Sequence, residues 1–371
     1  MVGPPLGVEL TSLDEIRQTC CRIIFILEWG RQMTLRNTFA SLAATAALAF
    51  SATTVSANSH NDYEPVEDCA WWNVGCDITQ HANRYNTQYP IVLVHGVSGF
   101  DKILFIEYWH GIPSELRGGD ANVWTPNLTA WGGSEQRGEQ LIDYINNVVL
   151  PATGASKVNL IGHSQGSPTS RYVASTAPDI VASVTSVHGA NGGSPFNDMM
   201  LNSIVPPDHP MYDAYVAFNE TLLNALGDVV DFLASGESFD QQSFDAVYQL
   251  STAGQIEYNA NYPEGKPTTE CGSGAEEVNG ISYYSWGGFA GVTNVLDPLD
   301  YAMTIVGALS APGTETDGLV PRCAQHWGKV LRDDYQHNHT DGSNMLLGMS
   351  GWTDPKDIFE SHASRLRQKG L

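Results

Sequence analysis

Basic residues are scarce in this sequence. Its 371 residues include 18 Lys and Arg against 41 Asp and Glu, which gives a formal net charge of -23. Nucleic acids and anionic lipid surfaces attract basic proteins, so this balance argues against both as electrostatic partners. Charged residues make up only 16% of the chain and apolar residues 42%, which is enough for a sizeable core and argues against intrinsic disorder.

Long apolar runs are also missing, so the sequence predicts no membrane span. The nearest approach is 33–57, which carries Arg36 near its start, has an Ala- and Leu-rich centre and ends in small residues. This pattern predicts a secretory signal peptide that is cleaved after Ala57. A membrane anchor is the alternative, and the many Ala and Ser residues disfavour it.

The regions on either side of this segment follow from that interpretation. Residues 1–32 do not suit a position ahead of a signal peptide, so we interpret them as an upstream extension, with Met33 as the start. The predicted mature chain is 58–371. No internal repeat or flexible linker divides it, so a single α/β domain is expected.

Cysteine is sparse as well, and four of the six cysteines follow the predicted signal peptide: Cys69, Cys76, Cys271 and Cys323. An even number in an exported chain indicates disulfides, with three possible connectivities. Spacing favours a local Cys69–Cys76 bridge and a long-range Cys271–Cys323 bridge. A zinc site is the alternative, and the absence of a C-x-x-C pair or a nearby His pair disfavours it.

Strands and helices alternate along the middle of the chain. Apolar-rich runs at 91–94, 157–161 and 180–187 are typical of buried strands. Between them, 136–150 has apolar residues at helical spacing, and 171–174 also favours a helix. This order predicts an α/β fold with a mostly parallel sheet and helices on both faces.

Two later segments extend the pattern. Residues 281–286 form a candidate strand. Residues 212–234 form an amphipathic insertion with one broad apolar face, for which an ordinary core-packing helix is the simplest interpretation.

One motif carries most of the chemistry. Residues 162–166 read Gly-His-Ser-Gln-Gly and fit G-x-S-x-G. The motif follows a predicted strand and precedes a predicted helix, which is the setting in which Ser164 becomes a nucleophile. The glycines avoid clashes in the tight turn, and the helix start offers an N–H group to an oxyanion. In this setting, a nucleophile is favoured over a chance loop.

A second oxyanion donor is expected from an earlier loop. His95 and Gly96 come directly after the strand at 91–94, at the strand edge where α/β proteins place their sites. We therefore expect the backbone N–H groups of Val97 and Gln165 to form the oxyanion hole.

A nucleophilic serine needs a base and an orienting acid, which follow it in the order acid, then His. The histidines after Ser164 are His188, His209, His326, His337, His339 and His362. The acid candidates are Asp297, Asp300, Glu315 and Asp317. Spacing does not separate His337 from His339, and the residues alone leave the acid open.

Several ordered stretches are together far more specific than the motif. They are 89–100, 107–113, 137–141, 157–166, 283–286, 296–298, 317–320 and 338–341. Through them the chain resembles the secreted, foldase-dependent triacylglycerol lipases of Pseudomonas and Burkholderia, from about Tyr89 to the C-terminus. The resemblance implies an α/β-hydrolase fold in which 212–234 is a helical lid.

The resemblance also implies roles for single residues. Ser164 would be the nucleophile, Asp317 the acid and His339 the base, with the oxyanion hole at Val97 and Gln165. The family disulfide falls on Cys271–Cys323, whereas Cys69 and Cys76 lie upstream of the matched region.

One structural calcium ion is implied as well. Its carboxylate ligands fall on Asp297 and Asp341, and its main-chain carbonyl ligands on Met345 and Met349. The family usually has Gln at the position of Met345, but a main-chain ligand does not depend on the side chain. Bound calcium would hold the loop that carries the base.

The implied activity is hydrolysis of lipid esters at an oil–water interface through an acyl-enzyme. The implied partners are a periplasmic foldase and the type II secretion machinery, which would deliver the enzyme outside the cell. Segment 188–194 departs from the Gly-x-Pro-His-x-Gly of many relatives and is expected near the active-site rim, where it would affect substrate preference. The alternatives are a short-chain carboxylesterase or polyester depolymerase, an acyltransferase, and a non-catalytic calcium-binding secreted protein.

Overall fold

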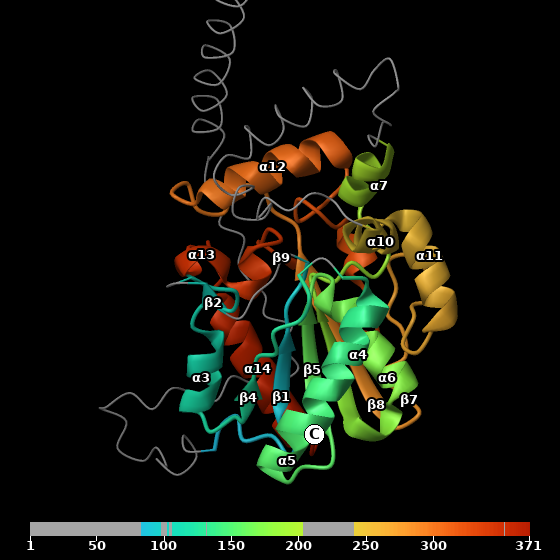
Figure 1. Cartoon of the computed structure of the whole chain (residues 1–371). Helices are drawn as coiled ribbons and strands as arrows, with labels where there is room; N and C mark the ends of the chain where they lie inside the picture. The colour runs from blue at the N-terminus through green and yellow to red at the C-terminus, as the bar shows by residue number, and fades with distance from the viewer. Residues whose placement is uncertain (1–82, 98–101, 104–105, 131, 203–240, 352) are drawn as a thin grey trace, which may run out of the picture. The chain divides into compact units, whose positions relative to one another are not determined.

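A seven-stranded sheet forms the centre of the computed structural model, which describes residues 83–371 apart from 98–101, 104–105, 131, 203–240 and 352 (Figure 1). Neighbouring strands pair in parallel, except at β7. The order across the sheet is β4 (Val123–Trp124), β1 (Ile91–Val94), β5 (Val158–His163), β6 (Val181–Val187) and β8 (Ile281–Gly288), and β8 also pairs with β7 (Glu277–Val278) and β9 (Lys329–Tyr335).

The inner strands form where the sequence is continuously apolar. Every residue of β1, β5 and β6 is buried, because helices cover both faces of the sheet. The strands predicted at 91–94, 157–161 and 180–187 are therefore confirmed, and the candidate strand at 281–286 is β8.

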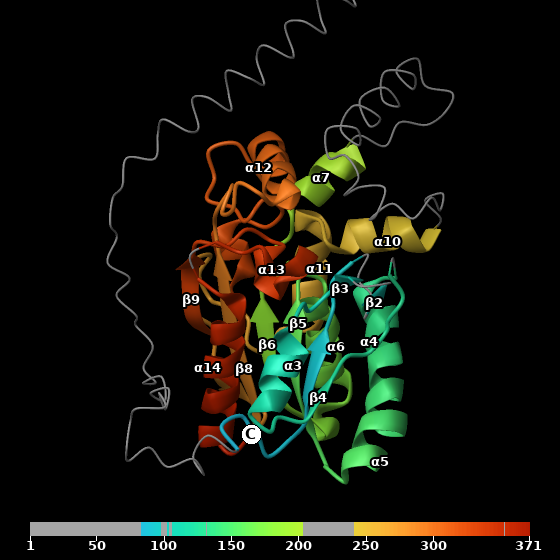
Figure 2. The ribbon, with the colours of Figure 1, turned by 90° about the vertical axis from the view of Figure 1, so that its left-hand side faces the viewer.

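Helices lie on the two faces in separate layers (Figure 2). On one face, α4 (Ser134–Tyr144) packs with α6 (Gly166–Thr176); on the other, α3 (Ile112–Gly118) packs with α14 (Pro355–Gln368). Successive strand residues pack into two hydrophobic cores, one on each face of the sheet. Leu93 belongs to the core with α3 and α14, and Val94 belongs to the core with α4 and α6. The predicted three-layer α/β architecture is confirmed.

The first predicted helix is longer and less regular than expected. After α4 the chain widens into a π-helical turn, Ile145–Val149, and continues as α5 (Leu150–Thr153). Pro151 has no N–H to donate to the preceding turn, and the wide turn lies directly before it. The helix predicted at 171–174 is α6, which begins only two residues after Ser164.

The remaining elements are α7 (Pro195–Asn202), α10 (Gln241–Gln249), α11 (Thr252–Asn261), α12 (Pro298–Ser310), α13 (Met345–Gly348) and the short pair β2 (Lys102–Ile103) and β3 (Ile106–Glu107). Of these, α7, α12 and α13 lie beyond the carboxyl ends of the strands (Figure 1). No helix in the described residues is long and apolar enough to cross a membrane. Several predicted features lie outside the described residues: the extension 1–32, the signal peptide 33–57, Cys69, Cys76, His209 and the lid candidate 212–234.

Candidate active site

A sharp turn between β5 and α6 carries Ser164. Its φ of 56° lies in the left-handed region, and its N–H donates to the carbonyl of Val187 at 3.0 Å. A side chain at Gly162 would overlap the backbone of Gly166, and one at Gly166 would overlap the carbonyl of Val94. The turn therefore needs both glycines, and it places the Ser164 hydroxyl at the carboxyl edge of the sheet.

A chain of two hydrogen bonds connects Ser164 to His339 and Asp317. The Ser164 Oγ lies 2.8 Å from His339 Nε2, and His339 Nδ1 lies 2.8 Å from Asp317 Oδ2. The three residues come from different places: the β5–α6 turn, the loop after α12 and the loop after β9. The fold thus brings together side chains that are up to 175 residues apart.

The structure separates the two neighbouring histidines that spacing left open. His337 is buried, and its Nε2 lies 2.8 Å from the carbonyl of Thr353. Only His339 of the pair hydrogen-bonds Ser164 and Asp317. Of the other histidine candidates, His326 pairs with Asp333 and His362 with the Thr185 hydroxyl.

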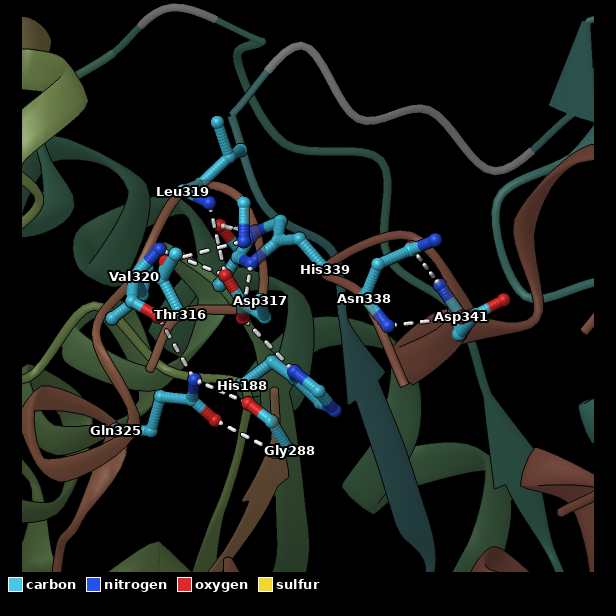
Figure 3. Close-up of polar contacts among 12 residues, drawn as sticks. His188, Gly288, Thr316, Asp317, Leu319, Val320, Gln325, Asn338, His339 and Asp341 are labelled. Atoms are coloured by element: carbon cyan, nitrogen blue, oxygen red, sulfur yellow. Dashed lines mark hydrogen bonds and ion pairs between the residues drawn. The ribbon is translucent and has the colours of Figure 1, made fainter. Parts of the chain in front are cut away.

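The Asp317 carboxylate is fully buried and accepts four hydrogen bonds (Figure 3). Its Oδ1 accepts from the N–H groups of Leu319 at 3.0 Å and Val320 at 2.8 Å, and its Oδ2 accepts from His339 and from His188, the latter at 2.9 Å. Burial alone would raise the pKa of Asp317, but the charge of His339 and the hydrogen bonds from both rings hold that pKa below its ordinary value. Because an ionised carboxylate only accepts, both rings present an N–H at Nδ1.

The loop after β1 is held by a buried arginine. Arg137 of α4 donates to the backbone carbonyls of His95, Gly96 and Thr129, the last two at 3.1 and 3.0 Å. Burial lowers the pKa of Arg137 to about 10, which leaves it charged at neutral pH. Val97 comes next in this loop.

Gln165 stands at the start of α6, where the first backbone N–H groups have no acceptor within the helix. Its side chain is buried and donates to the carbonyl of Gly132 at 2.8 Å, which fixes the residue. An N–H at this position, directly after Ser164, is suited to stabilise negative charge on a substrate oxygen.

His163 connects three loops of the site. Its Nδ1 lies 2.6 Å from the Tyr108 hydroxyl, whose oxygen accepts from the N–H of Gly96 at 2.9 Å. Its Nε2 lies 2.8 Å from the carbonyl of His339. Burial, then the charges of neighbouring histidines, lower the pKa of His163 well below its ordinary value. One neutral ring therefore connects the loop after β1, the turn of Ser164 and the loop of His339.

Three buried carboxylates, those of Asp297, Asp300 and Asp341, lie beside the loop of His339. Asn338 donates to Asp300 through its side chain and to Asp341 through its backbone, the latter at 2.9 Å. Burial, together with the charges of Asp300 and Asp297, raises the pKa of Asp341 to about 7. Burial and the charge of Asp300 raise the pKa of Asp297 to about 6.

These residues fit a calcium ion. A divalent cation stabilises the ionised form of carboxylates that raise one another's pKa, and calcium prefers carboxylate and carbonyl oxygens. Met345 begins α13 and Met349 follows it, so both lie just after Asp341 in the chain. Asp297 and Asp341 thus offer the buried carboxylate oxygens that the calcium site implied by the resemblance requires.

The disulfide Cys271–Cys323 is present, with 4.7 Å between the Cα atoms. It links the segment before β7 to the turn Arg322–Gln325, which follows the loop of Asp317. This is the long-range pairing that the sequence favoured.

A family model described as alpha/beta hydrolase fold matches residues 89–346 of the chain. A triacylglycerol lipase of Vibrio cholerae is 45% identical over 303 residues, which cover 81% of this chain and 95% of the relative. The chain belongs to the triacylglycerol lipase family of α/β hydrolases. A family member from Pseudomonas fragi is 39% identical over 294 residues, covering 77% of this chain and 98% of the relative.

Among solved structures, a metagenomic carboxyl esterase matches with a TM-score of 0.50 at 14% identity over 76% of each chain, and it supports the fold alone. The family, the α/β-hydrolase fold and the enzyme class predicted for this lipase-family protein, a serine ester hydrolase, are confirmed.

Segment 188–194 of this lipase-family chain lies beside Asp317, as its contact through His188 shows. Most of the segment is buried, and His188 and Asn191 are almost inaccessible to solvent. The reason is that both side chains form internal hydrogen bonds, His188 with Asp317 and Asn191 with the hydroxyls of Ser167 and Ser186.

Sequence reasoning assigned no role to Arg137, Tyr108 or His163. The first two lie in stretches that carried the family resemblance, and His163 lies inside the G-x-S-x-G motif. Their hydrogen bonds span 41, 12 and 176 residues, so no local pattern pointed to them.

Proposed function

We propose that the chain is a secreted triacylglycerol lipase, which hydrolyses ester bonds of lipids at an oil–water interface through Ser164, His339 and Asp317. The observation that carries the proposal is the unbroken chain of hydrogen bonds from Ser164 Oγ to His339 and on to Asp317, with 2.8 Å at each step. The relatives named triacylglycerol lipase supply the substrate class.

In this mechanism His339 takes the proton of Ser164 as the Ser164 oxygen attacks the ester carbonyl. His339 then gives the proton to the leaving alcohol, and a tetrahedral intermediate collapses to an acyl-enzyme. Water, activated by the same ring, hydrolyses the acyl-enzyme and regenerates the serine. Asp317 stays ionised throughout, because its environment holds its pKa low, and it stabilises the imidazolium.

The N–H groups of Val97 and Gln165 receive the oxyanion in both steps. Their loops are fixed by different contacts, since Arg137 holds the carbonyls before Val97 and the side chain of Gln165 is anchored to Gly132. Donors fixed before the reaction need no reorganisation when charge develops, which is why they lower the barrier.

One structural calcium ion completes the proposal. The carboxylates of Asp297 and Asp341 and the carbonyls of Met345 and Met349 would hold it, and its charge would stabilise the ionised carboxylates. Asp341 lies two residues after His339, so the ion would stiffen the loop of the base and take no part in the chemical step.

Export, a periplasmic foldase and the type II secretion machinery are further parts of the proposal. They follow from the signal-like segment 33–57 and from the family resemblance.

The test is hydrolysis of an emulsified long-chain triglyceride by the protein produced with a cognate foldase. Ser164→Ala should abolish the activity, whereas Ser114→Ala, a change at an exposed serine of α3, should leave it unchanged. Removal of calcium should reduce activity and thermal stability together. If Ser164-dependent cleavage is seen with short soluble esters but not with triglyceride, the chain is a carboxylesterase and the lipase proposal fails.

A further inference from the structure

The carboxylate of Asp317 has a second histidine partner, to which the triad mechanism gives no role. His188 Nδ1 lies 2.9 Å from Asp317 Oδ2, the same oxygen that meets His339 Nδ1 at 2.8 Å (Figure 3). We propose that His188 is a positioning residue, which holds the Asp317 carboxylate in the orientation that aligns His339 with Ser164. The inference rests on the proposed triad and adds one residue to it.

His188 is a costly residue at this place. It directly follows β6 with a φ of 46°, a left-handed conformation that is uncommon outside glycine and asparagine and costs free energy in most other residues. Its ring is fully buried, and among the described residues its Nε2 has no hydrogen-bond partner. Strain and an unpartnered polar atom both lower stability, so fold stability alone does not account for this histidine.

The single N–H of the ring is directed at Asp317. Burial lowers the pKa of His188, so the ring is neutral, and the ionised Asp317 requires the proton at Nδ1. The ring packs closely against the backbone of Gly342, where an added Cβ would lie only 2.5 Å from the His188 Cδ2. The donor is thus fixed by packing.

The other donors to Asp317 cannot anchor it in the same way. Leu319 and Val320 belong to the loop of Asp317 and move with it, and His339 is the residue to be aligned. His188, in contrast, is attached to the end of β6. The preceding residue, Val187, accepts the N–H of Ser164 at 3.0 Å, and the backbone N–H of His188 donates to Trp286 of β8 at 3.0 Å.

Two adjacent residues of one strand end therefore contact both ends of the triad. Val187 fixes the backbone of the nucleophile, and His188 fixes the carboxylate of the acid. A misplacement of about 1 Å in such a constellation can cost about a hundredfold in rate, so a rigid connection of this kind bears directly on kcat.

The same three groups could also be taken for a metal site. The nearest donor atoms of His188, Asp317 and His339 all lie within 4.8 Å of one another, and among the described residues this is the one such cluster. Because each imidazole already hydrogen-bonds the carboxylate, the geometry is that of shared protons and not of a bound metal.

The test compares two substitutions that both tolerate a left-handed backbone, His188→Gly and His188→Asn. Asn can donate from Nδ2, which is bonded to Cγ just as Nδ1 is in His, whereas Gly offers no donor. Kinetics with a soluble p-nitrophenyl ester give kcat and KM, and thermal midpoints report on folding. His362→Ala is the matched control, because His362 is equally buried but bonds Thr185, away from the triad.

We expect His188→Gly to lower kcat about 10- to 100-fold with KM unchanged, as for the loss of other groups that orient a reacting residue. His188→Asn should retain most of the wild-type kcat. His362→Ala should lower the thermal midpoint without this loss of kcat. Equal loss of kcat in the Gly and Asn variants would overturn the inference.

A double substitution separates positioning from packing. In an Asp317→Ala background there is no carboxylate to position, so adding His188→Gly should cause little further loss of kcat. If His188→Gly causes its full loss in that background, the ring acts through packing and the inference fails. Ser164→Ala is assayed in parallel. Activity that survives this substitution would refute the proposed triad. An unchanged kcat in His188→Gly, in an enzyme that does depend on Ser164, would refute only the role of His188.

Discussion

Stability without calcium should fall as the pH rises from about 4 to about 7. The group responsible is Asp341, whose folded pKa is raised to about 7 by burial and by neighbouring carboxylates. An acid with a raised pKa in the folded state favours folding while it is protonated. Its contribution is present below the unfolded pKa of about 3.9 and is lost as the pH rises through the folded value.

The magnitude follows from the two pKa values. A rise from an ordinary 3.8 to about 7 corresponds to about 4 kcal/mol of unfolding free energy, lost by the time Asp341 is fully ionised. For a domain of about 300 residues, with about 2.1 cal/mol/K of unfolding entropy per residue, that is a decrease of about 6 °C in the thermal midpoint. Asp297, with a pKa of about 6, titrates in the same window and adds to the effect.

The assay is thermal and urea unfolding in a chelator between pH 4.5 and 8, repeated with millimolar calcium. Calcium binds the ionised carboxylates, so its stabilising effect should grow across the same pH window. Asp341→Asn should remove most of the pH dependence and most of the response to calcium. Metal-free stability that stays flat or rises from pH 5 to 7.5, or an unchanged calcium response in Asp341→Asn, would refute the reasoning.

Three further predictions concern the loops of the site. Gly96→Ala should reduce kcat/KM by about a hundredfold in the ester assay, because the added Cβ would lie 2.8 Å from the Ser164 Cβ. Gly118→Ala is the control and should leave kcat/KM unchanged, because nothing lies within 4 Å of a Cβ at that position. Arg137→Met leaves buried carbonyls without their donor and should cost about 3 kcal/mol or more in urea unfolding and about a hundredfold in kcat; full activity would contradict its role in the loop. Cys323→Ser opens a disulfide that spans 52 residues and should cost about 4 kcal/mol in unfolding free energy, so an unchanged thermal midpoint would count against it.

Much of the fold could be predicted because its signals are local. The buried strands β1, β5 and β6 are continuous apolar-rich runs, and the G-x-S-x-G motif marks the turn between β5 and α6. Close backbone approach at Gly162 and Gly166 requires glycine, so the sequence pattern and the turn geometry have the same physical cause.

The partners in the site could not be predicted from the residues alone. His337 and His339 are two residues apart in the same polar run, and only contacts from distant segments distinguish them, Thr353 for the first and Asp317 for the second. The choice of Asp317 among four acids came from family resemblance, since its hydrogen bonds to His188 and His339 exist only after β6, β9 and the loop after α12 have packed.

The burial of His188 could not be predicted for a related reason. A histidine that follows a buried strand is expected at the exposed carboxyl edge of a sheet. Here the left-handed backbone of His188 and the covering loops at Asp317 and Gly342 enclose the ring instead. Such enclosure depends on segments more than a hundred residues away.

The order of the site along the chain has a consequence for biosynthesis. Ser164 leaves the ribosome 175 residues before His339, its proposed base, and Asp317 comes between them. A nascent, stalled or cleaved chain that ends before His339 therefore lacks the proposed base of Ser164. In the proposed mechanism, ester hydrolysis therefore begins only once synthesis has passed His339.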